Sequence, residues 1–115
     1  MAFPGTYNFN YYRGDTFEFI IRPKDGSGNE FPLTDYEAEF TIADIRGPEA
    51  EEQYTGQAVV NTVDNIITCT IDPTTGRSLT PGQLWLYDVE ITDGSSIFTL
   101  LNGSITVTDD ITGAV

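Results

Sequence analysis

The feature that most constrains this fold is an alternation of apolar and polar residues with a period of two. Successive side chains of an extended strand point to opposite faces, so such a stretch can bury one face in a core. In residues 16–22, Phe17, Phe19 and Ile21 share one face, with Ile20 as an exception. The same pattern predicts further inward residues: Ala38, Phe40 and Ile42; Ile67, Cys69 and Ile71; Trp85, Tyr87, Val89 and Ile91; Ile105 and Val107.

Turn-forming residues separate these stretches at short intervals. Gly, Pro, Asn, Asp and Ser gather at 25–29, 46–49, 64–65, 72–76, 81–82 and 93–96. Short strands at this spacing are typical of an all-β sandwich or barrel, and we count six or seven strands. The one helical candidate is "PTTGRSLT" at 73–80, which is long enough for a turn or two before Pro81.

One stretch departs from the alternation. Around Phe98, Leu100 and Leu101 the apolar residues change parity relative to Ile105 and Val107. We expect a β-bulge near Gly103 to absorb the shift.

Length and charge limit the organisation and the partners. The 115 residues predict one domain, with residues 1–12 as an aromatic N-terminal segment or first strand and residues 13–115 as the sandwich. Eighteen acidic and five basic side chains give a net charge of −13, which repels nucleic-acid phosphates and anionic lipids. We therefore expect no nucleic-acid partner and no membrane partner. The start "MAFPGTYNFN" also lacks the basic flank and apolar stretch of a signal peptide.

Residues with catalytic or metal-binding chemistry are sparse. The chain has no histidine and a single cysteine, Cys69, whose alternation with Ile67 and Ile71 favours a small buried apolar residue over a reactive thiol. No nucleophile or phosphate-loop motif is found. We therefore predict no enzymatic activity, no cofactor, no metal and no small-molecule substrate.

Two stretches rich in oxygen-bearing side chains are candidate cation or partner sites. Asp25, Ser27 and Asn29 place oxygens at every second position, as a calcium loop does, but the later positions of that loop do not fit, which favours a hairpin turn. The run at 49–52 is interpreted as a solvated loop, with docking to a basic partner as the alternative. A surface cation near this run, or near Asp109 and Asp110, is left open.

The tripeptide Arg13, Gly14 and Asp15 matches an adhesion motif. It stands directly before the alternating stretch, where glycine permits a positive φ and an Asp side chain can hydrogen-bond the turn. We interpret it as a turn, and expect the change Asp15→Glu to affect folding more than any receptor binding.

Five aromatic residues precede the first confident core strand: Phe3, Tyr7, Phe9, Tyr11 and Tyr12. One interpretation makes 7–11 a short strand with its odd positions inward. The other makes this segment an arm that contacts a neighbouring subunit, since aromatic side chains dominate interface energetics. The two are compatible. On the second interpretation, we expect deletion of residues 1–12 to leave a folded monomer that no longer enters particles.

Three segments together resemble a known family. "YRGDTFEFIIRPKDGSGNEFPLTDYEAEFTIADIRG", "LTPGQLWLYDVEIT" and "TLLNGSITVTDDIT" resemble the small immunoglobulin-like structural domains of tailed-bacteriophage virions, which are related to the N-terminal domains of baseplate proteins. The matching elements are Gly14 to Thr16, Pro32 to Thr34, Leu79 to Gly82, Tyr87 with Asp88, and Gly103 to Val107 with Asp110 and Thr112.

The resemblance implies an immunoglobulin-like antiparallel β-sandwich of six to eight strands in a single domain. It further implies a non-enzymatic virion protein, assembled in the cytoplasm of a host bacterium, that serves as a tail or baseplate adaptor. Its partners would be other phage structural proteins and itself. Because relatives often continue into receptor-binding or stalk domains, the end at Val115 leads us to expect a stand-alone subunit. A capsid decoration protein and a glycan-binding module are the alternatives.

Overall fold

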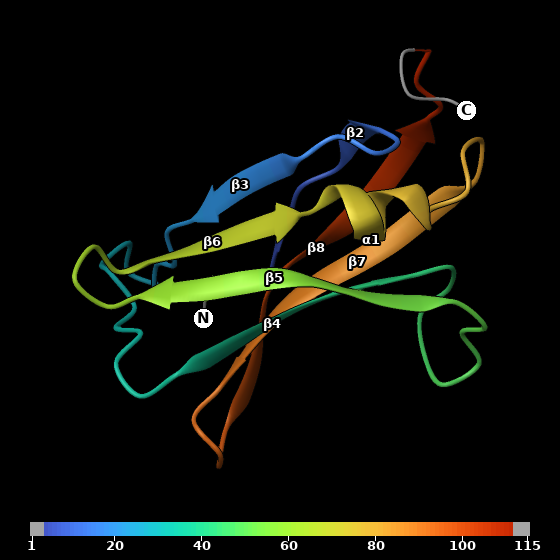
Figure 1. Cartoon of the computed structure of the whole chain (residues 1–115). Helices are drawn as coiled ribbons and strands as arrows, with labels where there is room; N and C mark the ends of the chain where they lie inside the picture. The colour runs from blue at the N-terminus through green and yellow to red at the C-terminus, as the bar shows by residue number, and fades with distance from the viewer. Residues whose placement is uncertain (1–3, 112–115) are drawn as a thin grey trace.

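The computed structural model describes residues 4–111, which form an all-β sandwich with one short helix (Figure 1). The strands are β1 (Gly5–Thr6), β2 (Phe9–Tyr12), β3 (Phe17–Ile21), β4 (Glu37–Ala43), β5 (Gln53–Asn61), β6 (Ile66–Ile71), β7 (Leu84–Thr92) and β8 (Ile97–Thr108), and the helix is α1 (Pro73–Arg77). The predicted all-β, single-domain fold is confirmed.

The strands form one sheet that curls into two layers. Their order is β1-β8-β7-β4-β5-β6-β3, and β2 also pairs with β8. The bend lies in β5, whose first half pairs with β4 and whose second half pairs with β6. One layer therefore holds β3, β6 and the second half of β5, and the other holds β4, β7 and β8. These correspond to the B-E-D and C-F-G strands of an immunoglobulin sandwich.

The N-terminal strands extend the larger layer. β1 and β2 both run parallel to β8, and are the exception to the antiparallel pairing elsewhere. A turn at Arg13 and Gly14 then carries the chain across to β3 in the other layer. Both free edges of the curled sheet, β3 and β1–β2, thus lie on the same side of the molecule.

The core is made from the residues that the alternation placed inward. Those that are buried are Phe40, Ile42, Ile67, Cys69, Ile71, Trp85, Tyr87, Val89, Ile91, Ile105 and Val107. Phe17, Phe19, Ile21 and Ala38 are partly buried and pack against them. Trp85 also donates a hydrogen bond from Nε1 to the carbonyl oxygen of Thr80, 3.1 Å away, which ties the connection after α1 to the core.

Two details differ from the sequence-based expectation. The bulge lies at Leu100, because Val89 is paired with Leu101 whereas Glu90 is paired with Thr99, so Leu100 is the extra residue. It does not lie at Gly103, where close packing against the N-terminal segment fixes a regular register. The helix also ends at Arg77, three residues before the end of the predicted stretch. Its start is capped by Asp72, whose Oδ1 accepts a hydrogen bond from the Thr75 backbone NH at 2.7 Å.

Candidate functional site

The five N-terminal aromatic residues are divided between the core and the surface. Phe9 and Tyr11 are only 8% and 1% exposed, so the odd positions of β2 point inward as predicted. Tyr7 and Tyr12 are 42% and 58% exposed. Phe3 lies outside the described residues. A role in contacting a neighbour therefore stays a prediction for Tyr7 and Tyr12, because this chain's own core encloses the other two.

The Arg-Gly-Asp tripeptide forms the turn between β2 and β3, as predicted. Gly14 has φ of +88°, and the backbone NH of Asp15 donates to the carbonyl oxygen of Tyr12 at 3.0 Å. The Asp15 side chain is exposed and makes no hydrogen bond within residues 4–111, contrary to expectation. Asp15 contributes its carbonyl oxygen instead, which accepts a 2.6 Å hydrogen bond from the Tyr11 hydroxyl.

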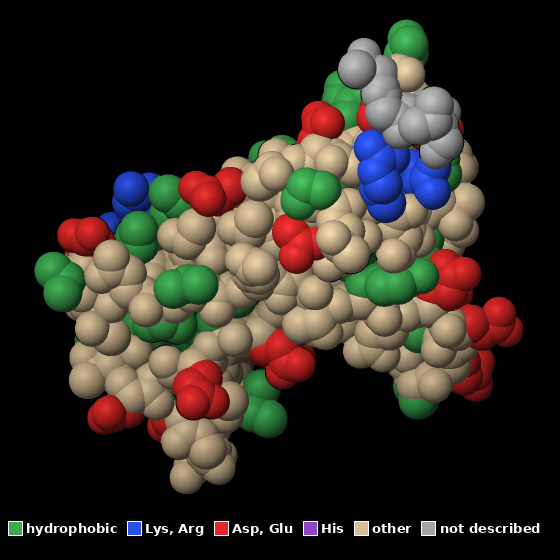
Figure 2. Space-filling model, viewed as in Figure 1, with side chains coloured by type: hydrophobic (Ala, Val, Ile, Leu, Met, Phe, Trp, Pro, Cys, Tyr) green, Lys and Arg blue, Asp and Glu red, His purple; other side chains and the backbone are tan. Residues whose placement is uncertain are grey.

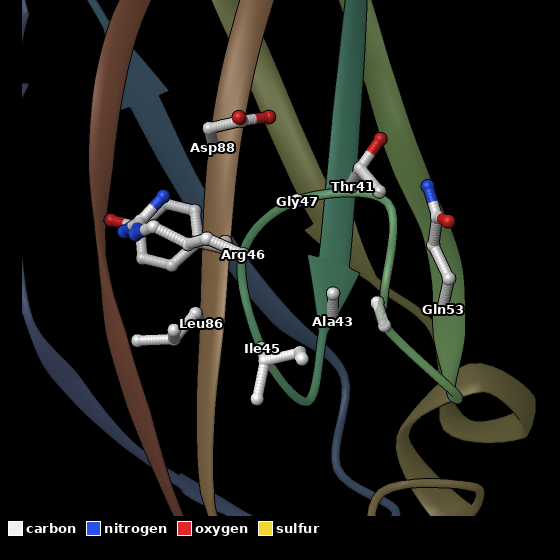
Figure 3. Close-up of a pocket in the computed structure, with 10 residues that line it drawn as sticks. Thr41, Ala43, Ile45, Arg46, Gly47, Gln53, Leu86 and Asp88 are labelled. Atoms are coloured by element: carbon white, nitrogen blue, oxygen red, sulfur yellow. The ribbon is translucent and has the colours of Figure 1, made fainter.

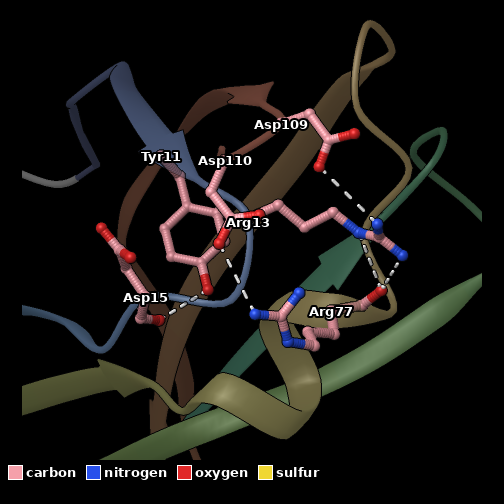
Figure 4. A network of polar contacts seen from close by, with 6 residues as sticks. All are labelled: Tyr11, Arg13, Asp15, Arg77, Asp109 and Asp110. Atoms are coloured by element: carbon pink, nitrogen blue, oxygen red, sulfur yellow. Dashed lines mark hydrogen bonds and ion pairs between the residues drawn. The ribbon is translucent and has the colours of Figure 1, made fainter. Parts of the chain in front are cut away.

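The chain itself holds the arginine of this tripeptide (Figure 4). Arg13 donates from Nε and Nη2 to the carbonyl oxygen of Arg77, at 3.1 and 2.9 Å, and its Nη1 lies 3.7 Å from Asp109 Oδ1. Arg77 in turn lies 3.5 Å from Asp110 Oδ2. The guanidinium of Arg13 thus joins the turn after β2 to the C-terminal end of α1 and to the chain after β8.

The β3 edge, defined as residues 17–22, is a free edge of the sheet. β3 pairs with β6 on one side, and within residues 4–111 no other backbone group is hydrogen-bonded to the strand. A free strand edge presents unpaired NH and C=O groups that can bind another strand. This edge is therefore open to backbone pairing with a second chain.

An apolar groove runs beside the β3 edge. We call it the edge groove; its volume is about 420 Å³, and it is lined by Tyr7, Phe19, Ile20, Ile21, Arg22 and Leu101. It lies where β3 approaches the N-terminal segment, and the ring centroids of Tyr7 and Phe19, which both line it, are 5.8 Å apart. The groove combines apolar side chains with one cation at its end, a composition suited to protein side chains.

The outer face of the smaller layer is mostly uncharged. In Figure 2 the surface over β3, β5 and β6 carries hydrophobic and neutral side chains, with scattered acidic groups. The pairing register places Ile20, Thr68 and Val59 in one row across three strands. Ile20 is 44% and Val59 is 61% exposed. This row begins at the β3 edge and extends away from it.

The larger layer presents acidic groups on its outer face. Glu39 is paired directly with Glu90 across β4 and β7, and Asp88 lies two residues before Glu90. Burial raises the pKa of Asp88, an effect that the nearby Arg46 opposes, and burial together with Asp88 and Glu39 raises the pKa of Glu90. Like charges that face each other across strands destabilise the fold. The acidic groups therefore cost stability in the isolated chain.

A second hollow lies under the loop between β4 and β5 (Figure 3). It has a volume of about 300 Å³, and its lining includes Thr41, Arg46, Leu86 and Asp88. Arg46 arches over β7 and reaches the carbonyl oxygen of Gly103 at 3.5 Å. The side chain of Arg46 thus lies along this hollow and is held there by its contact with the backbone of β8.

The remaining candidates for chemistry are accounted for structurally. Cys69 is fully buried in the core, as predicted, and this burial raises the pKa of its thiol to about 12. Asp25 Oδ1 accepts hydrogen bonds from the backbone NH groups of Ser27 and Asn29, as the turn interpretation predicts.

Within residues 4–111, no group of three or more His, Cys, Asp or Glu side chains is placed to hold a metal ion. No helix in that range has the length and apolar character needed to cross a membrane.

Comparisons with protein-family models and with curated proteins found no match to this sequence.

Sequence reasoning missed the β3 edge and its groove as a site. The signal was present in "FEFIIR", in which Ile20 breaks the polar face of an otherwise alternating strand. A single outward apolar residue is a weak signal on its own, because exposed apolar residues are common on protein surfaces. What the sequence did not reveal is that β3 would be the last strand of its layer.

Proposed function

We propose that this chain is a non-enzymatic structural subunit that works through protein–protein contacts, as a tail or baseplate adaptor in the virion of a tailed bacteriophage. The observation that carries the contact role is the free β3 edge with the apolar edge groove beside it. Backbone groups on the edge supply binding energy to an added strand, and pockets beside the edge supply selectivity.

The phage part of the proposal rests on the sequence resemblance, and several of the shared elements occupy turns and close contacts of the sandwich. Gly14 and Gly82 both have positive φ, at +88° and +80°, in turns that only glycine adopts without strain. Gly103 lies against the carbonyl group of Tyr7, where a side chain would collide. The elements that resemble phage structural domains are therefore those that fix the turns and the packing of this sandwich.

The partners under this proposal are other structural proteins of the virion and further copies of this chain. The negative charge of −13 disfavours non-specific association of subunits, so that association requires surfaces with local charge complementarity. Assembly would take place in the cytoplasm of the bacterial host.

Localisation in assembled particles tests the proposal. An epitope-tagged copy should be labelled at the tail or baseplate in electron micrographs of particles that carry this gene, and loss of the gene should prevent tail assembly. Labelling over the capsid would instead assign the chain as a decoration protein. Particles that assemble normally without the chain, combined with specific binding on a glycan array, would replace the proposal with a saccharide-binding role.

A further inference from the structure

The β3 edge has no bulge and no inward-pointing charge; its charged residues Glu18 and Arg22 point outward, and Pro23 and Lys24 follow directly after it. Natural edge strands are guarded by proline, lysine, inward charges or bulges. β3 has the sequence FEFII, pairs with β6 in regular register over all five residues, and points Phe19 and Ile21 toward the core. A regular edge of this kind is suited to pair with a strand whose charges complement those of Glu18 and Arg22.

The outward residues at this edge alternate in character. Glu18, Ile20 and Arg22 follow one another at a spacing of two, which places them on the same outer face of an extended chain. Glu18 and Arg22 are both exposed, and neither forms an ion pair with any residue from 4 to 111. The edge thus presents an acidic, an apolar and a basic side chain in that order. Both charged side chains can form ion pairs with a second chain.

We propose that two copies of this chain associate through their β3 edges, in an antiparallel pair with Ile20 on the two-fold axis. This deepens the proposed function, on which it rests, by naming a second copy as the partner at this edge. In this register Ile20 lies opposite Ile20 of the second copy. Glu18 of each copy lies opposite Arg22 of the other.

Charge complementarity selects this register over the others. Centring the pair on Glu18 or on Arg22 would set like charges opposite each other, which is unfavourable. Centring it on Phe19 would place Glu18 opposite Ile20, so neither charge would gain a partner. Parallel pairing would align Glu18 with Glu18. The Ile20-centred antiparallel register alone joins two opposite-charge pairs around an apolar contact.

The surroundings of β3 extend the contact. The row of Ile20, Thr68 and Val59 would continue through its counterpart in the second copy, giving one six-stranded layer. The inward Phe19 and Ile21 of the second copy would lie at the mouth of the edge groove, near Tyr7 and Leu101. A two-fold contact of this type is closed, so it produces a dimer as the unit of assembly.

Charge-swap variants of the full chain test the proposal in sedimentation experiments. The wild type should sediment as a dimer of twice 12.7 kDa within the micromolar to millimolar range at physiological salt. E18R and R22E should each weaken dimerisation at least tenfold, and E18R/R22E should restore most of the loss. E18R also reduces the net negative charge, which by itself would favour association, so weakening by this variant identifies a specific pair. The control E49R makes the same change in charge on the exposed β4–β5 loop and should not weaken the dimer.

A cysteine variant tests the register directly. In I20C the new thiols face each other across the axis, so mild oxidation should give a covalent dimer, whereas the buried Cys69 of the wild type should give none. Circular dichroism of every variant confirms that it is folded. A wild type that stays monomeric throughout the range, or a double variant no better than the single ones, would overturn the dimer. If the chain is monomeric but still enters particles, the dimer is overturned and the proposed function stands. If the chain forms dimers but is absent from particles, the proposed function is overturned and the dimer stands.

Discussion

At the scale of single residues, like charges that face each other on the larger layer lower the stability of the isolated chain. Glu39 and Glu90 face each other across β4 and β7, and the pKa of Glu90 is raised by burial, Asp88 and Glu39. A carboxyl group with a raised pKa binds protons more tightly in the folded state than in the unfolded state. Its contribution to stability is therefore present at acid pH and is lost as the pH rises through the folded pKa.

The variant E90Q should be more stable than the wild type at neutral pH, by about 0.2–1 kcal/mol, because it removes a like-charge cross-strand pair. The gain should shrink toward zero as the pH falls through the raised pKa of Glu90, because the wild-type carboxyl is then protonated and uncharged. Urea unfolding across this pH range measures the difference. The control E37Q removes a charge opposite Thr92 and should gain less; an equal gain would mean that net charge alone is responsible.

Cys69 should be chemically silent in the folded protein. Its thiol is fully buried and has a pKa of about 12, so almost no thiolate is present or accessible at about pH 8. An aromatic disulfide reagent should react at once in denaturant and only at the rate of unfolding in its absence. Fast native reaction would show that β6 does not pack as described.

At the scale of elements, the sequence predicted strands well where large apolar residues alternate. β7 is the clearest case, since Trp85, Tyr87, Val89 and Ile91 are all buried. β5 was missed because its inward positions include Gly56 and Ala58, which carry little hydrophobic signal. Gly56 is required there because the ring of Phe40 covers its Cα. The requirement for glycine at position 56 thus comes from a contact between two strands, which the pattern of a single strand cannot show.

The same limit applies to the candidate site. The sequence placed Ile20 as an exception on an otherwise polar face, but a free edge is a property of the strand order. Which strand ends a layer depends on pairings between segments far apart, such as β3 with β6. Local alternation contains no information about those pairings, so the edge groove became visible only once the strands were placed.

Attachment of the N-terminal segment to β8 depends on Gly103. A side chain there would collide with the carbonyl group of Tyr7, whose NH donates to Asn102 at 2.9 Å. G103A should therefore destabilise the fold by about 1–3 kcal/mol, as overpacking does. The control G5A places its Cβ 3.6 Å from Leu101 Cδ1, an ordinary contact, and should be tolerated. Thermal unfolding compares the two, and similar losses would contradict this packing.

At the scale of the whole molecule, the N-terminal segment belongs to the sandwich. Residues 5–12 supply β1 and β2, and the ring of Phe9 stacks on that of Phe17 with centroids 4.5 Å apart, joining the two layers. We now expect deletion of residues 1–12 to destabilise the fold, in place of the folded monomer expected from the sequence, because deletion removes two buried aromatic residues, Phe9 and Tyr11, from the core. Contact with neighbours has to be tested by substitutions that spare these residues.

Two substitutions in β2 separate the structural role from the contact role. F9A should lower the free energy of unfolding by about 3–5 kcal/mol, because it opens a cavity between the layers. Y12A, at a side chain that is 58% exposed, should change it by no more than about 0.5 kcal/mol. Guanidinium unfolding measures both. If Y12A is folded and excluded from particles, Tyr12 contacts a neighbouring subunit; if Y12A is as unstable as F9A, the division of β2 into a core face and a free face is incorrect.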